Sequence, residues 1–286
     1  MMNVQKHGLR STSVYLVSVF TLLFFASCED VLEDFEVPNE GENIVVDGRI
    51  TDHDSTVVRI SRTAPYFSDA ATSLETGATV RLKSDMGLDA LLAESSPGVY
   101  SYPDSGIIDR SYHIEITLAN GDQYISDPEL LKAVPPIDTA YWGDVEEDGE
   151  TKYEIYFTST DVQEQEDYYR WLYYVNGVLG NIPNDIAISD DDLYDGNEVD
   201  EITLDNDFLE LGDKMSIEQL SISKEYFSFL EILFNNTADQ GSPFSSPPAP
   251  LIGNVRKVGS TSEFALGYFN ASAVVYAEVI AGVKNF

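Results

Sequence analysis

Apolar and polar residues alternate with a period of two through most of residues 43–126. Such alternation, carried by β-branched and aromatic residues, is typical of strands with one buried face. Turn sequences separate the runs, and Asn120-Gly121 is the strongest hairpin signal among them. About seven strands over about 90 residues predict a β-sandwich-like domain, immunoglobulin-like or transthyretin-like, over residues 43–131. The predicted strands are 44–50, 56–63, 78–82, 90–93, 97–102, 112–118 and 123–126.

A second β-rich domain is predicted over residues 137–286. Pro135 and Pro136 mark the boundary, because paired prolines stiffen the chain and end strand pairing. Residues 168–175 are apolar on both faces and therefore predict a central strand, followed by a second Asn-Gly turn. The other predicted strands of this domain are 137–142, 153–159, 215–223, 252–258 and 264–271.

One amphipathic helix interrupts the strand pattern near residues 224–235. Ser223 can cap its first turn, and Glu225 suits the positive end of the helix dipole. Apolar residues then recur every three or four positions, which gives the helix one buried stripe. A proline-rich loop follows over residues 241–250. The stripe consists of Tyr226, Phe227, Leu230, Leu233 and Phe234.

The N-terminus has the layout of a secretory signal. Lys6 and Arg10 precede a short apolar run from Val14 to Ala26, and small residues come before Cys28, the only cysteine. The segment resembles a bacterial lipoprotein signal, so we predict that residues 1–27 are removed and that Cys28 carries the lipid. An uncleaved membrane anchor and a buried core cysteine are the alternatives.

Acidic residues dominate the chain and define the predicted tether. Residues 28–42 hold five acids in their first nine positions, which predicts an extended, solvated link between lipid and domain. The run also resembles the export tag of surface lipoproteins in Bacteroidota, although the acids can equally serve only to keep a linker soluble. A net charge of −34 argues against nucleic acid as a partner.

Catalytic groups are scarce, and we predict no enzymatic activity. His53 and His113 are the only histidines after residue 27, and no free thiol or nucleophile motif accompanies them. With 50 acidic residues, some carboxylate pair will always resemble a glycosidase site, so abundance alone gives no support. No cofactor is predicted apart from a weak candidate for Ca²⁺.

The calcium candidate lies in residues 185–201, where eight of 17 positions are acidic. Ca²⁺ takes six to eight oxygen ligands, many of them from carboxylates. The spacing does not match an EF-hand loop, and a solvated acidic loop is the more ordinary interpretation. The candidate ligands are Asp190, Asp191, Asp192 and Asp195.

Aromatic residues offer a candidate ligand platform. Tyr141, Trp142, Tyr169 and Trp171 present flat apolar faces with polar tips, which suit stacking against sugar rings or aromatic ligands. Because these residues lie on strands predicted to be central, the interior of a sandwich is the competing interpretation.

Several stretches together resemble a known family. The chain is similar to the Bacteroidota outer-membrane lipoproteins filed as domain of unknown function 4249, over nearly all of its length after the signal. The resemblance implies location and a class of partner, TonB-dependent outer-membrane receptors, and supplies no ligand or catalytic residue. The stretches that carry it include 44–51, 61–67, 77–80, 97–100, 121–126, 136–138, 193–196, 221–227 and 266–269.

These observations favour a lipid-anchored outer-membrane protein that faces the cell exterior. We expect it to act as an accessory ligand-binding or lid subunit of a TonB-dependent nutrient transporter. A structural or adhesive surface protein without a transport partner is the alternative, because β-sandwich-like modules often mediate contact.

Overall fold

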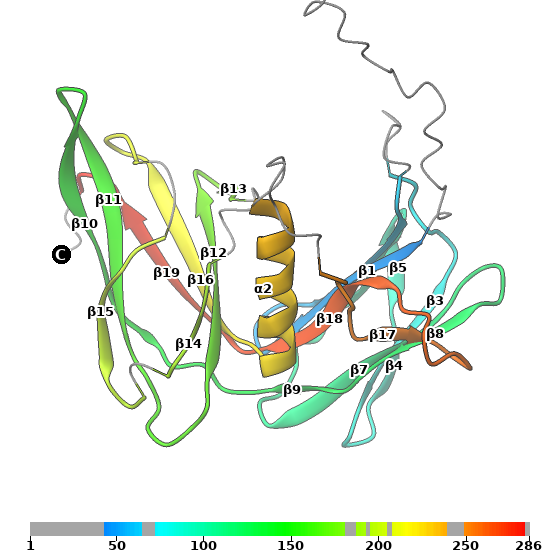
Figure 1. Ribbon diagram of the computed structural model, residues 1–286. Coiled ribbons are helices and arrows are strands. Elements are labelled where there is room, and N and C mark those ends of the chain that lie inside the picture. The colour runs from blue at the N-terminus through cyan, green and yellow to red at the C-terminus, as the bar shows by residue number, and fades with distance from the viewer. Residues whose placement is uncertain are drawn as a thin grey trace, which may run out of the picture. The chain divides into compact units, whose positions relative to one another are not determined.

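The computed structural model describes residues 43–64, 72–180, 187–192, 195–204, 208–238 and 249–283. The predicted signal peptide (1–27), Cys28, the tether (28–42) and most of the proline-rich loop lie outside these residues. The described part is mainly β, with one helix, as the alternating pattern predicts (Figure 1).

Two sheets form a first sandwich around one hydrophobic core. One sheet has the order β18-β1-β2-β6-β5, and the other has the order β17-β8-β7-β3-β4 with β9 beside β7. Their strands are β1 (Ile44–Thr51), β2 (Thr56–Arg62), β3 (Thr79–Ser84), β4 (Asp89–Leu91), β5 (Ala93–Ser96), β6 (Val99–Tyr102), β7 (Arg110–Thr117), β8 (Gln123–Ser126), β9 (Glu129–Leu131), β17 (Val255–Lys257) and β18 (Leu266–Ser272).

Alternation along the strands builds this core. Val46 and Ile50 of β1 point inward, and Ile114 and Ile116 of β7 meet them from the opposite sheet, all 1% exposed or less. Phe269 of β18 joins the same cluster and is fully buried. The alternation of the sequence is therefore the direct cause of the sandwich.

The C-terminal part of the chain completes the first sandwich. β18 pairs with β1 in parallel, which is the one parallel pairing among the described strands, and β17 pairs with β8. Residues 255–257 and 266–272 thus belong to sheets whose other strands lie within residues 43–131. The sequence boundary between residues 131 and 137 therefore does not separate the hydrogen-bonded sheets.

A second sandwich surrounds another apolar cluster. The order is β10-β11-β15 in one sheet and β13-β12-β16-β19 in the other, with β14 also paired to β12. Phe157 from the first sheet meets Trp171 and Ile217 from the second. The strands are β10 (Ile137–Glu147), β11 (Glu150–Thr160), β12 (Tyr168–Val175), β13 (Val178–Leu179), β14 (Ala187–Asp190), β15 (Glu198–Ile202), β16 (Lys214–Ser221) and β19 (Val274–Ile280).

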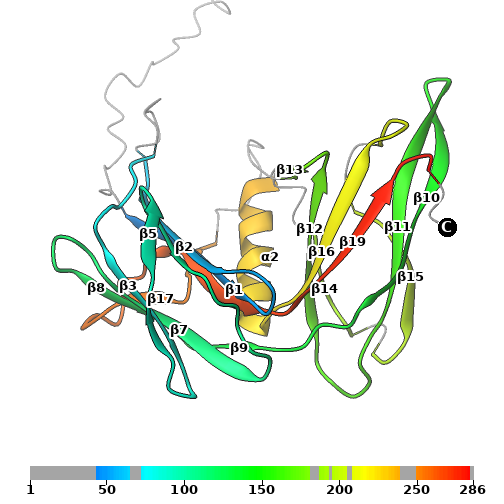
Figure 2. The ribbon, with the colours of Figure 1, turned by 180° about the vertical axis from the view of Figure 1, so that it is seen from behind.

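The helix α2 (Lys224–Ala238) covers the other face of the β12–β16 sheet (Figures 1 and 2). Ser223 caps it, since the backbone N–H of Tyr226 donates to Ser223 Oγ at 3.1 Å. Tyr226 and Leu230 pack with Tyr268 of β18. The predicted helix is confirmed and runs three residues beyond its expected end. Within the described residues, no helix is long and apolar enough to cross a membrane.

Several strands differ from the sequence expectation, among them the short β9 and β13, which match no predicted strand. β14 and all but the last residue of β15 fall within the stretch 185–201, for which a solvated acidic loop was the more ordinary interpretation. β19 follows β18 after a single intervening residue, Ala273, where no further strand was expected. Three of the eight acidic residues of this stretch lie between β14 and β15, and one of them, Asp191, belongs to the first candidate site.

Candidate functional site

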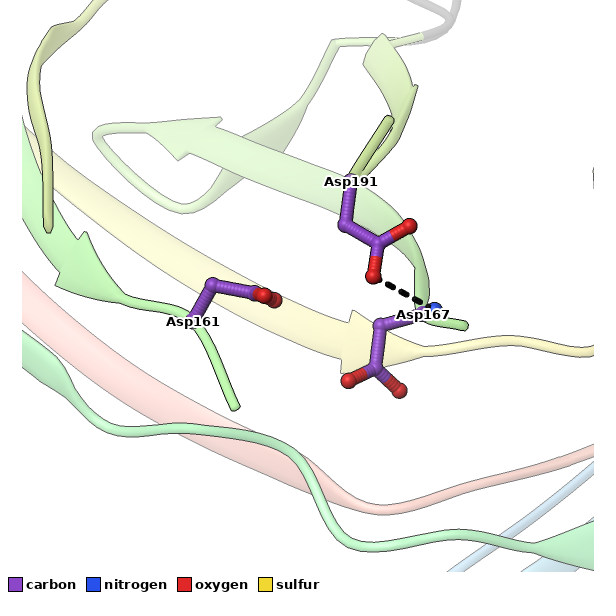
Figure 3. A group of neighbouring side chains, drawn as sticks. All are labelled: Asp161, Asp167 and Asp191. Atoms are coloured by element: carbon purple, nitrogen blue, oxygen red, sulfur yellow. Dashed lines mark hydrogen bonds between the residues drawn. The ribbon is translucent and has the colours of Figure 1, made fainter. Parts of the chain in front are cut away.

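Three buried aspartates gather at one end of the second sandwich (Figure 3). Asp161 directly follows β11, Asp167 directly precedes β12, and Asp191 directly follows β14. The pairing of β14 with β12 brings Asp191 beside Asp167, and Asp161 comes from β11 of the facing sheet. One carboxylate oxygen of each residue lies within 4.8 Å of the others, and the side chains are 7%, 2% and 4% exposed. We call this group the acidic cluster.

Neighbouring donors hold each carboxylate of the acidic cluster in place. Asp161 accepts hydrogen bonds from the hydroxyl of Tyr169 and, at 3.0 Å, from the backbone N–H of Gly196. Asp191 Oδ2 accepts from the backbone N–H of Asp167 at 3.0 Å, which is the dashed line in Figure 3. These contacts link the end of β11 to the segment before β15, and the start of β12 to the end of β14.

Lys132 supplies the positive charge at the acidic cluster. Its Nζ lies 2.5 Å from Asp167 Oδ1 and also donates to the carbonyl oxygen of Glu166 at 2.6 Å. The amide of Gln165 donates to both oxygens of Asp167 at 3.1 Å. One ammonium thus faces three carboxylates, so the ionised cluster carries an excess of negative charge.

Burial raises the pKa of Asp191, and the charges of Asp161 and Asp167 act in the same direction. A cluster of this kind can take up a proton, or it can bind a cation that prefers oxygen ligands, such as Ca²⁺. Three carboxylates are fewer than the six to eight oxygens that Ca²⁺ takes, so backbone carbonyls or water must complete the shell.

The four predicted calcium ligands are not brought together. Asp191 turns inward and joins Asp161 and Asp167, whereas Asp192 and Asp195 are exposed. Asp195 instead accepts from the backbone N–H of Glu164 at 2.7 Å, and Asp190 is half-buried at the end of β14. Sequence reasoning missed Asp161 and Asp167, because they meet Asp191 only through the pairing of β14 with β12 and the packing of the sheet that contains β11.

The four aromatic candidates occupy different surroundings. Tyr169 and Trp171 are 4% and 6% exposed and lie in the core of the second sandwich. Tyr141 is 38% exposed and stacks on Tyr156, with ring centroids 5.5 Å apart. Trp142 donates from Nε1 to the carbonyl oxygen of Val283 at 2.8 Å. Tyr169 and Trp171, on β12, therefore lie in the interior, whereas Tyr141 and Trp142, on β10, belong to the other sheet.

The space beside Tyr169 and Trp171 is too small for a sugar ring. It is a cavity of about 10 Å³, also lined by Asp161 and Gln219. That volume holds about one water molecule. Gln219 accepts from Trp171 Nε1 at 2.9 Å, so the indole is already satisfied.

A larger pocket lies against the first sandwich, and we call it the Glu129 pocket. Its volume is about 500 Å³, within the range of small-molecule sites. Four separate segments form its wall: the chain entering β9, the first turn of α2, the residues before β17, and β18. Its polar groups include those of Glu129, Ser223, Glu225, Asn254 and Tyr268.

Glu129 is the buried acid of this pocket, with 5% of its surface exposed. Its Oε1 accepts from Tyr268 Oη at 2.8 Å and from Asn254 Nδ2 at 3.2 Å. Its Oε2 is buried without a hydrogen-bond partner among the described residues. Ser223 is near enough to favour the charged carboxylate, but its hydroxyl makes no hydrogen bond to Oε2.

Burial raises the pKa of Glu129, and the charge of Glu225 adds to this effect. The nearby hydroxyl of Ser223 and the hydrogen bonds from Tyr268 and Asn254 oppose the shift without cancelling it. Burial and the charge of Glu129 also raise the pKa of Tyr268, so its hydroxyl stays a donor at neutral pH.

Close backbone packing fixes the wall of the Glu129 pocket. A Cβ on Gly253 would lie 1.8 Å from the carbonyl oxygen of Gly267, so only glycine permits this approach. Asn254 then holds β18, because its Oδ1 accepts from the N–H of Phe269 at 2.9 Å and its Nδ2 donates to the carbonyl of Phe269 at 2.8 Å. The side chain that donates to Glu129 is thereby anchored to the sheet.

Comparison with known proteins gives a family and little more. No curated protein matches this chain. A solved structure of α-L-rhamnosidase from Dictyoglumus thermophilum is similar with a TM-score of 0.23 and 11% identity, and the match covers 65% of this chain and 28% of that one. A likeness this weak carries no argument. The family model described as "Domain of unknown function (DUF4249)" matches residues 33–277, and the chain therefore belongs to that family.

Proposed function

We propose that this protein is a lipid-anchored outer-membrane protein that serves as an accessory ligand-binding or lid subunit of a TonB-dependent nutrient transporter. The observation that carries the proposal is the Glu129 pocket. A concave space of about 500 Å³ with a few converging polar groups is the usual form of a small-molecule site. Among the described residues, no donor makes a hydrogen bond to one oxygen of its buried acid, Glu129 Oε2.

Sequence features support the location in this proposal. Cys28 follows an apolar run and small residues, as in a lipoprotein signal, and the acidic residues 28–42 separate it from the first described strand. Fully extended, these fifteen residues reach about 50 Å. That length allows an anchored domain to contact a neighbouring receptor without leaving the membrane surface.

The family resemblance supports the class of partner, since lipoproteins of this family resemble partners of TonB-dependent receptors. A ligand pocket on a tethered domain suits a subunit that captures a nutrient or closes over a receptor. The proposal assigns no catalytic step to the protein.

Growth and uptake by a deletion strain test this function. We expect slower growth on at least one nutrient at limiting concentration, with normal growth when that nutrient is abundant. The wild-type gene should restore growth, and the Cys28→Ala variant should not, because it lacks the anchored residue. Unchanged uptake across the nutrient panel, combined with lost surface adhesion, would contradict the proposal and favour the adhesive alternative.

A further inference from the structure

The charge around the Glu129 pocket indicates which ligands it accepts. Glu129 and Glu225 both line the pocket, and no ion pair with either is recorded within the described part of the chain. Asp127, also on the rim, is paired with Arg256. Two of the three pocket carboxylates therefore lack a positive partner.

Nearby cations are engaged elsewhere. Lys224, adjacent to Glu225 in sequence, has its Nζ 2.7 Å from Glu166 Oε1. Lys132, just after β9, pairs with Asp167 in the acidic cluster. The carboxylates of Glu129 and Glu225 are therefore available to pair with a cationic ligand.

The unsatisfied oxygen of Glu129 needs a hydrogen-bond donor. A buried polar atom without a partner loses its hydration and gains nothing in return. A cationic N–H group restores the hydrogen bond and also compensates the charge, so it meets both needs at once. Ammonium and guanidinium groups carry only donors, which suits a site whose free groups include carboxylate oxygens.

Apolar side chains on the rim determine the rest of the ligand. Leu130 and Ile252 line the pocket and are 49% and 59% exposed. Their exposed area suits a short alkyl chain. The pocket therefore combines a buried anion with an open aliphatic wall.

We infer that the Glu129 pocket binds a small aliphatic amine or guanidine, whose cationic group donates to Glu129 Oε2 while its alkyl chain lies against Leu130 and Ile252. This inference rests on the proposed function, because it names the chemical class that the subunit receives. Oε2 is covered by neighbouring atoms of the protein. Entry of the cation therefore requires neighbouring side chains to move.

Calorimetric titration of the lipidated protein in detergent tests the inference. The probe is 1,5-diaminopentane, and the matched control is 1,5-pentanediol, which has the same chain length and neutral donors. We expect saturable binding of the diamine with a Kd below about 1 mM, and at least ten-fold weaker binding of the diol. Agmatine, which carries a guanidinium group, should compete with the diamine.

Variants assign the binding to this pocket. Glu129→Gln keeps the shape of the side chain and removes its charge, so the affinity should fall about ten- to a hundred-fold, as expected for a lost charge-assisted hydrogen bond. Glu225→Gln changes an exposed side chain and should weaken binding by a smaller factor without affecting the fold. Glu231→Gln removes the same charge from an exposed position of α2 outside the pocket, and should leave the affinity unchanged.

Three results would overturn the inference: no binding of the diamine, equal binding of the diol, or full affinity in both Glu129→Gln and Glu225→Gln. None of them bears on the partnership with a receptor, which is measured separately by co-purification. A transporter subunit that captures a neutral ligand would still pass that second test.

Discussion

Replacing Lys132 with methionine tests whether this lysine stabilises the acidic cluster. Lys132 Nζ lies 2.5 Å from Asp167 Oδ1, and the two side chains are 29% and 3% exposed. The variant leaves Asp161, Asp167 and Asp191 without their ammonium partner. Removing one member of a buried ion pair costs about 3–5 kcal/mol, and the partial exposure of Lys132 places the expected loss near the lower end, at about 3 kcal/mol.

Thermal and urea unfolding followed by circular dichroism measure this loss. For a domain of this size, about 3 kcal/mol corresponds to a decrease in Tm of about 6–12 °C. The matched control is Lys214→Met, since Lys214 pairs with Glu278 at 2.6 Å and both side chains are exposed. An exposed pair contributes about 0–1 kcal/mol, so the control should lose at most a few degrees.

A double variant and a pH series refine the test. Adding Asp167→Asn to Lys132→Met removes one of the uncompensated charges and should recover part of the loss. The loss should also decrease as the pH falls, because burial raises the pKa of Asp191 and protonation removes the repulsion. If Lys132→Met loses no more stability than Lys214→Met, the lysine does not stabilise the cluster.

Calorimetric titration with Ca²⁺ tests the candidate metal site, and no heat together with an unchanged Tm would eliminate it.

Other variants test separate parts of the account. In the absence of ligand, Glu129→Gln should raise Tm at pH 7, because burial raises the pKa of this carboxyl. The contribution of Glu129 to stability is fully present below its unfolded pKa of about 4.3 and is lost as the pH rises through its folded pKa. The gain should vanish at pH 4, and a gain independent of pH would contradict this reasoning. Ser223→Ala removes the acceptor for the N–H of Tyr226 and should cost about 1 kcal/mol in urea unfolding, with Ser223→Gly closer to wild type. Phe269→Ala empties a fully buried position and should cost about 3–5 kcal/mol; a loss below 1 kcal/mol would argue against the packing of β18. Cys28→Ala should remain unprocessed or leave the outer membrane on fractionation, and a chain that stays anchored would refute the lipoprotein interpretation.

Local patterns were sufficient to predict most strands and the helix. β12 is a clear example, because residues apolar on both faces predict a central strand, and it pairs with β16 on one side and with β13 and β14 on the other. The cap at Ser223 likewise locates the start of α2. These features depend on neighbouring residues, which a sequence displays directly.

The missed strands have two physical causes. β14 and β15 contain acidic residues that imitate a solvated loop, and their pairing with β12 and β11 overrides that local preference. β19 begins one residue after β18, without a glycine or proline turn between them, so no turn signal marked a second strand after the predicted strand 264–271. The parallel pairing of β18 with β1 joins the two ends of the described chain, which no local pattern reports.

Both sites depend on contacts between distant segments. The acidic cluster needs β14 beside β12 before Asp191 can meet Asp161 and Asp167. The Glu129 pocket needs four segments, and the decisive feature is one oxygen without a donor. Neither the acidic cluster nor the Glu129 pocket can be recognised in the sequence, because both form only in the tertiary structure.

Co-purification most directly tests the claim that this protein works with a transporter. The tagged protein is solubilised from outer membranes in mild detergent, captured, and its bound proteins are identified by mass spectrometry. The tagged Cys28→Ala variant, expressed at the same level, is the matched control. The account predicts that the wild type retains a TonB-dependent receptor in a stable ratio and that the control does not. Repeated capture of the anchored wild type without any such receptor would contradict the account.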